Sequence, residues 1–431
     1  MAPTKRFEST LVGLKYPSER DSVIKTGAKW LKDKRQDDGA EGLWRVDDKL
    51  YDLNEFAKSH PGGTEWITLT RDTDITEAFE AHHVRSTAEL MLPKFFVRNA
   101  IAPRASPFTF KPDGFYRKFK ARAREALKDV DFHKSSRTSN LIADSLFVGT
   151  IALSVIAATT RSWIAIVGSG VLLTWTAITG HNFMHQRDSF RMYYMDLLLL
   201  SSREWRINHA LSHHLFTNTV QDMEITAFEP FLSWLPRPDK GPFTRFVSWI
   251  ISPPVYTLMI FEEGLKRIYS TFWEWNGPGV RDAVPFLVPA AMCVVAPPAV
   301  ALWTWMKVIA VASFHFTAVG VSAAHHHPDI FHDGDVHRED MDWGLAELDA
   351  VRDRAEIDTS IFLVLTSFGS HSLHHLLPSV DHAYLYLCEP AFAETCKEFG
   401  ISTELWSQWD HVKGQFLQLV NNAPKKTANT R

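Results

Sequence analysis

Between residues 141 and 380 the chain alternates long apolar stretches with polar stretches rich in histidine. Residues 141–160 contain one charged side chain, Asp144, and residues 162–180 contain none. At about 1.5 Å per residue, a helix of either length crosses a hydrocarbon core of about 30 Å. Because only Arg161 separates the two stretches, the pattern predicts a hairpin of two membrane-spanning helices.

A second apolar pair covers residues 283–324, so about four transmembrane helices are expected in total. Lys307 lies near the far end of this pair, where a long side chain reaches the polar interface. Residues 246–261 are shorter and contain Pro253-Pro254, so we expect them to lie at the interface or to be half-inserted. The alternative, core helices of a soluble protein, would require unusually long core helices. Prolines make the boundaries of the second pair uncertain: Pro285, Pro289, Pro297 and Pro298.

The polar regions indicate the topology and exclude several classes of protein. The segment 106–140 is basic, which places it in the cytosol by the positive-inside rule. An even number of spans then brings every histidine-rich stretch to the cytosolic side. Lys and Arg number 46 against 50 Asp and Glu, which argues against a nucleic-acid partner. The three cysteines cannot form a disulfide framework, and the polar N-terminus predicts no secretory signal.

Two motifs lie in the N-terminal polar region, LYDLNEFAKSHPGG and ITEAFEAHH. His60 precedes Pro61-Gly62-Gly63, where proline fixes a turn and the glycines allow close approach of a flat ligand. The two motifs resemble the cytochrome b5 family. The resemblance implies a haem b with two axial imidazoles, His60 and His83, and His82 remains the alternative second ligand. Such a haem has no open iron position and moves single electrons.

Three further histidine clusters follow in the second half of the chain. Residues three or four apart share one face of a helix, so each cluster is able to direct several imidazoles at one centre. Eight such side chains exceed the needs of one tetrahedral zinc ion. They are His181, His185, His209, His213, His214, His371, His374 and His375.

The clusters and their flanks, WRINHALSHHLFTNTVQDMEI and HSLHHLLPSVDHAYL, resemble the membrane fatty-acid desaturase family. The resemblance implies two non-haem irons, with His325 of the sequence Ser-Ala-Ala-His as a ninth ligand. Asp222 and Glu224 are candidates to accept the second ring N–H of ligand histidines. Three features depart from the family pattern: Asn182 replaces an aspartate, the second box is HxxxHH, and His371 stands where many fused enzymes have glutamine.

The other histidines are assigned structural roles. His315 is expected to pack inside a span, and His382 to pack or to bond a ligand. His133 and His411 are expected at the surface. A polar loop holds four more that are not expected to bind metal: His326, His327, His332 and His337.

The predicted fold is a small α+β haem-binding domain followed by an all-α multi-pass membrane domain with a cytosolic cap of histidine boxes. The predicted boundaries are 40–105 for the haem domain, 106–140 for the linker, 141–390 for the membrane domain and 391–431 for a cytosolic tail.

The resemblances together imply an O2-dependent di-iron fatty-acyl desaturase with a fused electron donor, in the endoplasmic reticulum membrane. The expected partners are a membrane lipid or acyl-CoA, O2 and an NADH-cytochrome b5 reductase. A fatty-acid or sphingolipid hydroxylase would share the oxidant, and the altered boxes also fit a non-catalytic haem electron carrier. A zinc protein would leave the haem unexplained.

Overall fold

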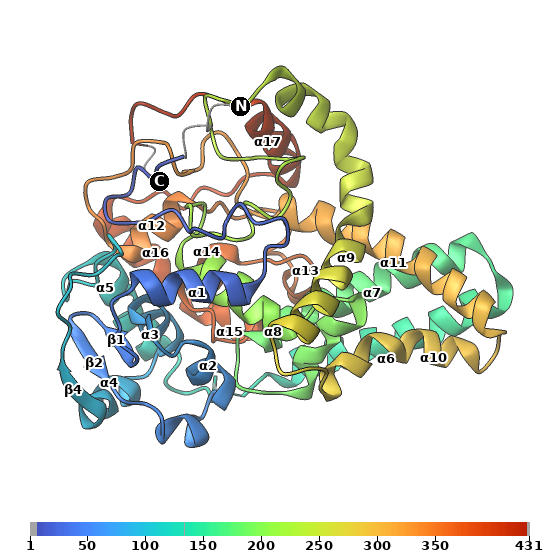
Figure 1. Ribbon diagram of the computed structural model, residues 1–431, viewed down its shortest axis with the longest axis horizontal. Coiled ribbons are helices and arrows are strands. Elements are labelled where there is room, and N and C mark those ends of the chain that lie inside the picture. The colour runs from blue at the N-terminus through green and yellow to red at the C-terminus, as the bar shows by residue number, and fades with distance from the viewer. Residues whose placement is uncertain (1–6, 133, 429–431) are drawn as a thin grey trace.

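The computed structural model describes residues 7–132 and 134–428. His133, expected at the surface, and residues 1–6 of the polar N-terminus lie outside this range. The described chain forms a compact head and a projecting helical arm (Figure 1). The N-terminal region, predicted to bind haem, lies at the side of the head away from the arm (Figure 1).

The N-terminal region contains a small mixed sheet in the order β3-β1-β2-β4. Strand β1 pairs antiparallel with β2 and parallel with β3. Trp44, Tyr51 and Phe79 are buried between this sheet and its helices. The strands are β1 (Trp44–Val46), β2 (Lys49–Tyr51), β3 (Thr73–Asp74) and β4 (Phe96–Asn99). The helices are α1 (Gly27–Asp37), η1 (Phe56–Ser59), α2 (Thr64–Leu69), α3 (Thr76–His82), α4 (Thr87–Met91) and η2 (Leu92–Phe95).

The basic segment after this domain is part of the packed head. It forms α5 (Phe115–Ala126), whose Phe115, Tyr116 and Phe119 are fully buried. Lys120 of the same helix is buried in an ion pair with Glu80 of the haem domain (3.0 Å). The helix therefore joins the two domains by contact as well as by chain connection.

The first predicted hairpin is present as α6 (Arg137–Thr160) and α7 (Trp163–Met184). Ser136 caps α6, and Arg161 ends it in the left-handed conformation (φ 57°), which turns the chain at once into α7. Together with α11 (Pro298–Val321), these are the three helices of the described residues that are long and apolar enough to cross a membrane.

The first half of the second predicted hairpin is shorter than expected, so the fourth span is not confirmed. It forms the 3-10 helix η7 (Val280–Phe286) and α10 (Leu287–Cys293), which lies beside α6 and α11 in the arm (Figure 1). Pro285 and Pro289 each lack a backbone donor, and Pro297-Pro298 begin the next helix.

A long helix, α9 (Ser248–Trp273), crosses the base of the arm and contains the segment predicted to lie at the interface (Figure 1). It includes Pro253 and Pro254 and is preceded by the π-helix η6 (Phe243–Val247). The elements between α7 and η6 are short: η3 (Phe190–Leu198), α8 (Ser202–Trp205), η4 (Arg206–Ser212) and η5 (His213–Leu215).

The C-terminal region is folded onto the head and is more than a polar tail. His411, expected at the surface, is 1% exposed and packs near Trp406, so that expectation is wrong. Its helix buries one face against the head, a pattern that the polar composition concealed. The helices are α12 (Trp343–Asp349), α13 (Ile361–Thr366), α14 (His371–Leu376), α15 (His382–Leu385), η8 (Tyr386–Cys388), α16 (Glu389–Phe399) and α17 (Gln408–Val420).

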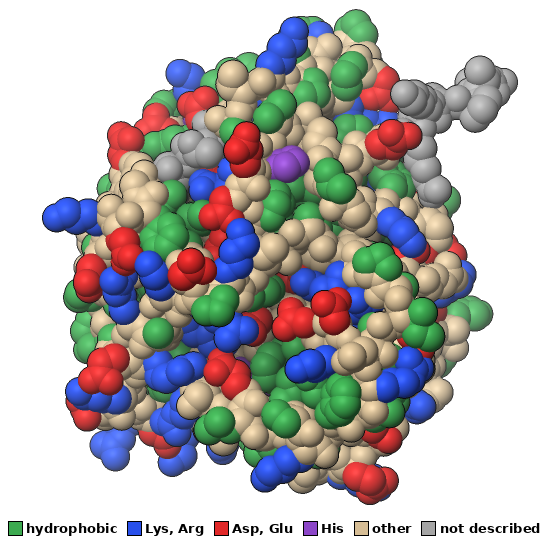
Figure 2. Space-filling model, turned by 90° about the vertical axis from the view of Figure 1, so that its left-hand side faces the viewer, with side chains coloured by type: hydrophobic (Ala, Val, Ile, Leu, Met, Phe, Trp, Pro, Cys, Tyr) green, Lys and Arg blue, Asp and Glu red, His purple; other side chains and the backbone are tan. Residues whose placement is uncertain are grey.

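The two ends of the molecule differ in surface chemistry. The face on the haem-domain side carries interspersed acidic and basic side chains (Figure 2). The arm instead exposes large apolar side chains, among them Val148, Ile164 and Leu302. At its far end the Lys307 ammonium lies over the rings of Trp163 and Trp303.

Candidate haem pocket and metal centre

His60 and His83 face each other across the predicted haem pocket. His60 follows η1, and its Nδ1–H donates to the Gly63 carbonyl (2.9 Å). His83 follows α3, and its Nδ1–H donates to the Phe79 carbonyl (2.9 Å). These bonds leave each Nε2 available, and the ring centres are 6.3 Å apart. Two imidazoles that bind one metal from opposite sides at about 2.0 Å each have ring centres about 6 Å apart, so the pocket fits a haem iron.

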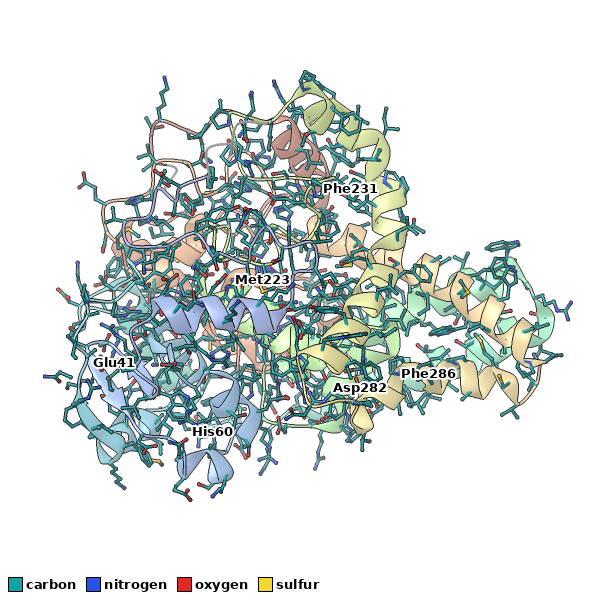
Figure 3. All side chains as sticks on the ribbon, viewed as in Figure 1. Glu41, His60, Met223, Phe231, Asp282 and Phe286 are labelled. Atoms are coloured by element: carbon teal, nitrogen blue, oxygen red, sulfur yellow. The ribbon has the colours of Figure 1, made fainter. Side chains whose placement is uncertain are left out.

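The neighbouring His82 points elsewhere. Its Nδ1–H donates to the Ala78 carbonyl (3.0 Å), and its ring lies 5.5 Å from that of Trp66. Burial lowers the pKa of His82 to about 4 and of His83 to about 3, so both rings are neutral, as a metal ligand must be. The orientation of the rings supports His83 as the partner of His60. Figure 3 labels His60 at the lower left of the head.

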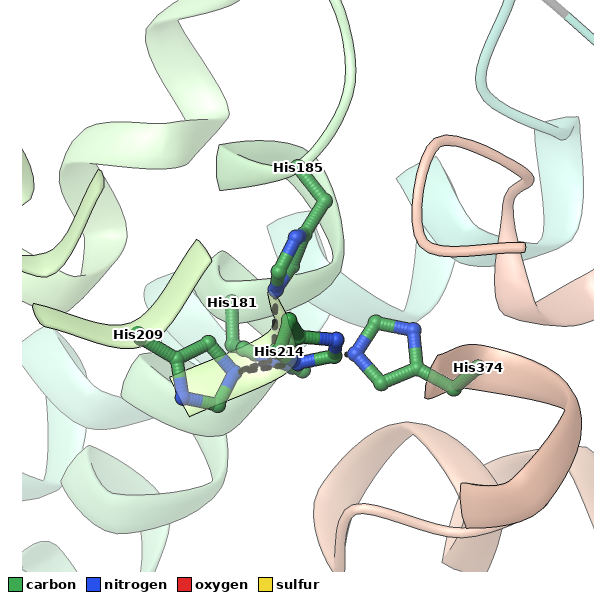
Figure 4. Close-up of side chains that lie close together, drawn as sticks. All are labelled: His181, His185, His209, His214 and His374. Atoms are coloured by element: carbon green, nitrogen blue, oxygen red, sulfur yellow. Dashed lines mark hydrogen bonds between the residues drawn. The ribbon is translucent and has the colours of Figure 1, made fainter. Parts of the chain in front are cut away.

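Five histidines from all three predicted boxes form one buried cluster (Figure 4). Their ligand atoms lie within 4.8 Å of one another: His181, His185, His209, His214 and His374. The Nε2 of His209 lies 2.7 Å from Nε2 of His181 and 2.9 Å from Nε2 of His214. Two nitrogens bound at about 2.1 Å and at right angles around one metal ion are about 3 Å apart. The spacing therefore fits a multi-histidine metal site.

A second buried cluster contains the other four predicted ligands, His213, His325, His371 and His375. The Nε2 of His325 lies 2.7 Å from that of His371 and 3.2 Å from that of His213. The Nε2 of His375 is buried and has no hydrogen-bond partner, as expected of an atom directed at a metal. The second box thus divides its histidines between the clusters, because η4 is a π-helix and a short 3-10 helix follows it.

Carboxylates and carbonyls orient the outer nitrogens of several cluster members. Glu224 accepts from Nδ1 of His209 (2.6 Å), and Asp222 accepts from Nδ1 of His213 (2.9 Å). Burial alone would raise the pKa of Glu224, but the adjacent His213 and His209 hold it at about 2. Such contacts fix the tautomer that presents Nε2 to a metal.

Sequence reasoning missed Glu347, which accepts from Nδ1 of His375 (2.9 Å) and from the Thr217 hydroxyl (2.6 Å). Burial raises the pKa of Glu347 to about 8. This residue lies in α12, in a stretch without a recognisable spacing motif, so no local signal identifies it.

The remaining histidines of the described residues lie outside both clusters. His326 stacks on Trp234 (4.3 Å), and His327 packs near Trp406 (4.4 Å). His382 lies 4.4 Å from the ring of His374 but belongs to neither cluster. His332 bonds the Ile330 carbonyl, and His337 bonds the Arg338 carbonyl. The ring of His315 lies 6.3 Å from that of Trp175.

The haem domain packs directly on the segments that carry the boxes. Glu65 forms ion pairs with Arg203 (3.1 Å), Arg206 (2.9 Å) and Arg281 (3.0 Å). Gly63 lies so close to Asp188, three residues after the first box, that a Cβ there would be 2.5 Å from the carboxylate.

The third box contacts the haem domain through two hydrogen-bonded bridges. The Ser379 hydroxyl donates to the His82 carbonyl (2.9 Å). The Tyr116 hydroxyl lies 3.0 Å from the Glu80 carbonyl and 3.2 Å from the Leu376 carbonyl. The backbone beside His83 is therefore in contact with the flank of the third box.

A cavity of about 1220 Å³ reaches the clusters from the side of α9. His209, His213, His325 and His371 line its inner end, together with Trp205 and Phe368. It exceeds the range of about 300–1,000 Å³ that is usual for small-molecule pockets. The space is large enough for a long flexible ligand beside the metal-binding side chains.

Comparison with known proteins identifies two regions in the chain. The Fatty acid desaturase family model matches residues 157–404, and the Cytochrome b5-like Heme/Steroid binding domain model matches residues 29–101. The chain is 40% identical to the cytochrome b5-related protein of Drosophila melanogaster over 98% of both chains. No solved structure gives a significant match.

More distant relatives are named as desaturases. The chain is 21% identical to the acyl-lipid (8-3)-desaturase of Mortierella alpina, over 82% of this chain and 87% of that protein. It is 25% identical to the sn-1 linoleoyl-lipid 6-desaturase of Arthrospira platensis, over 56% of this chain and 73% of that protein.

Proposed function

We propose that this chain, which belongs to the fatty acid desaturase family and carries a cytochrome b5-like domain ahead of it, introduces a double bond into a lipid acyl chain with O2 and two non-haem irons. The observation that carries the proposal is the convergence of nine buried histidines in clusters of five and four. Sites of this kind suit iron, and the five-histidine cluster exceeds a tetrahedral zinc site.

The protein side chains have distinct roles in this proposal. When bound, the irons supply the O2-activating chemistry that an unactivated C–H bond requires. The nine histidines would hold them. Burial keeps the pKa of His214, His374 and His375 well below the ordinary value, so these rings are neutral. Burial alone would also lower the pKa of His213, but Asp222 and Glu224 outweigh it and raise this pKa to about 9, so a bound metal would displace the proton. Glu224, Asp222 and Glu347 keep the rings oriented.

The fused domain supports an intramolecular electron supply. Reduction of O2 to water takes four electrons, of which two come from the substrate C–H bonds and two must come from outside. A haem held by His60 and His83 supplies single electrons, and an NADH-cytochrome b5 reductase is the proposed source. The contacts through Ser379, Tyr116 and Glu65 support a donor that stays beside the boxes without a diffusional encounter.

The arm supports an integral membrane location. We propose that η7 and α10 complete the fourth span beside α6, α7 and α11, which returns the chain to the side where it began. The haem domain and the boxes then face the cytosol at the endoplasmic reticulum membrane. The charged face of the head (Figure 2) and the exposed apolar side chains of the arm are consistent with this placement.

Metal content and product analysis test the proposal together. The purified full-length protein is expected to contain one haem iron and two further irons. Cells that express it should gain a new unsaturated fatty acid, and cells that express a His181→Ala variant should not. Haem without non-haem iron would instead indicate an electron carrier. A hydroxylated product would indicate a hydroxylase.

A further inference from the structure

We infer that the cavity takes the acyl chain of an intact membrane lipid whose head group has no net charge, and not the acyl chain of a coenzyme A thioester. This inference rests on the proposed desaturase function and names the carrier of its substrate. The observation behind it is that each basic side chain lining the cavity already has a partner within the protein.

The apolar wall of the cavity faces the side where the bilayer would lie. Val255, Leu258 and Met259 of α9 line it opposite Phe316 of α11. Leu258 is 61% exposed, and α9 crosses the base of the apolar arm (Figure 1). Phe231, which also lines the cavity, is 59% exposed and is labelled at the upper end of α9 in Figure 3. A chain that enters here comes from lipid and does not need to cross water.

Each of the four basic side chains that line the cavity, among the residues the structure describes, has a partner within the protein. Lys266 pairs with Glu263, and Arg237 pairs with Asp239 (2.8 Å). The other two lining cations bond backbone carbonyls: Lys25 to Thr226 (2.6 Å) and Lys240 to Asn421 (2.8 Å).

The balance of charge in the lining also disfavours a polyanionic head group. Outside the metal-binding end the lining has four basic side chains and five acidic ones, which are Asp21, Glu229, Asp239, Glu262 and Glu263. Coenzyme A carries several phosphate groups, and proteins bind such groups with unpaired arginines, lysines or helix N-termini. Mixed, internally paired charges suit a head group such as phosphocholine, which carries one charge of each sign.

Photo-crosslinking measures which carrier the cavity accepts. The probe is a phosphatidylcholine with a diazirine on its acyl chain. It is mixed in detergent with the full-length haem-containing protein, once with its non-haem iron and once after that iron has been removed by a chelator. We expect crosslinks to peptides of residues 251–259. Unlabelled phosphatidylcholine should suppress them at a concentration about tenfold lower than oleoyl-CoA does. Equal or stronger competition by oleoyl-CoA, or no crosslinks in this segment, would overturn the inference.

A charge variant sharpens the test. Asp239→Asn frees the half-buried Arg237 from its exposed partner, so oleoyl-CoA should compete about two- to fivefold better, the range of one surface ion pair. Glu55→Gln, an exposed change in the haem domain, is the matched control and should leave competition unchanged. If Asp239→Asn has no effect, the paired cations are not what excludes the thioester and the charge argument is wrong.

Pulse labelling in cells separates this inference from the proposed function. After a short pulse of labelled fatty acid, the new double bond should appear first in phospholipid chains. Its appearance first in acyl-CoA would overturn the choice of carrier and keep the desaturase. A protein with two non-haem irons and no product in either pool would contradict the desaturase, while the crosslinking result would still decide which lipid the cavity binds.

Discussion

The haem pocket and the nine-histidine centre both depend on imidazoles that converge, but the chain assembles them in different ways. In the haem pocket, His60 and His83 each take their orientation from a carbonyl three or four residues away. In the metal centre, carboxylates farther away along the chain orient three of the nine rings, those of His209, His213 and His375. His375, for example, is oriented by Glu347.

The difference lies in how much of each site is local. A loop and a helix end suffice to position each haem ligand, so the geometry of the pocket depends little on contacts with the rest of the molecule. The metal centre exists only when α7, η4, the segment after α11 and α14 are packed together. Loss of a ligand in one region should therefore leave the other intact.

The largest effect is expected from removal of one axial ligand. His60→Ala should abolish the low-spin bis-histidine haem spectrum completely, because one face of the ring loses its ligand. Non-haem iron should remain at the wild-type level, as measured by metal analysis of the purified protein. Loss of both kinds of iron would show that the two sites fold as one unit.

The second haem ligand is tested by a neighbouring pair. His83→Ala should abolish the low-spin spectrum, since its ring faces His60 at 6.3 Å. His82→Ala should keep the spectrum, because that ring lies against Trp66. The opposite pattern in absorption spectra would transfer the ligand role to His82.

The ninth metal ligand is tested in the same way. His325→Ala should lower non-haem iron from two to about one per chain, because it removes one of only four imidazoles in its cluster. His327→Ala is the matched control, since that ring packs near Trp406 outside both clusters. The haem spectrum should be normal in both variants. Two irons in His325→Ala would remove it from the ligand set.

Local motifs could be predicted from the sequence, and long-range assembly could not. His60, Pro61 and the two glycines form a turn within one short segment. The apolar runs of α6 and α7 likewise encode a hairpin by length and polarity alone. By contrast, the burial of α5 and of His411 depends on surfaces supplied by distant parts of the chain. The division of the second box between two clusters depends on a π-helix, which spacing rules for α-helices do not describe.

A moderate effect is expected from Glu347→Gln. The amide keeps the shape but is a poorer acceptor for Nδ1–H of His375 than the carboxyl group, so iron affinity should fall about 10- to 100-fold without loss of the fold. Titration with a chelator, followed by metal analysis and by the haem spectrum, measures the change. Glu339→Gln, an exposed neighbour in sequence, should titrate like wild type. If both variants release iron alike, the carboxylate does not tune the site.

The smallest effect is expected at the contact between the two regions, where Glu65 meets Arg203, Arg206 and Arg281. Glu65→Gln should leave both sites loaded but weaken docking by about 1–3 kcal/mol, because the buried Arg206 guanidinium loses a charged partner. Trypsin should then cut after Arg98 or Arg104, in the segment that joins the two regions, about tenfold faster, whereas Glu55→Gln should not change the rate.

Acid should mimic this variant. Burial raises the pKa of Glu65, but the three arginines outweigh it and hold the pKa below the usual value of 4.5. The folded-state pKa is depressed, so the stabilisation is fully present above pH 4.5 and is lost as the pH falls through the lower folded value. Cleavage by an acid-active protease should accelerate in that window in the wild type and less in Glu65→Gln. An identical acid response in both proteins would show that a carboxylate other than Glu65 controls the docking of the two regions.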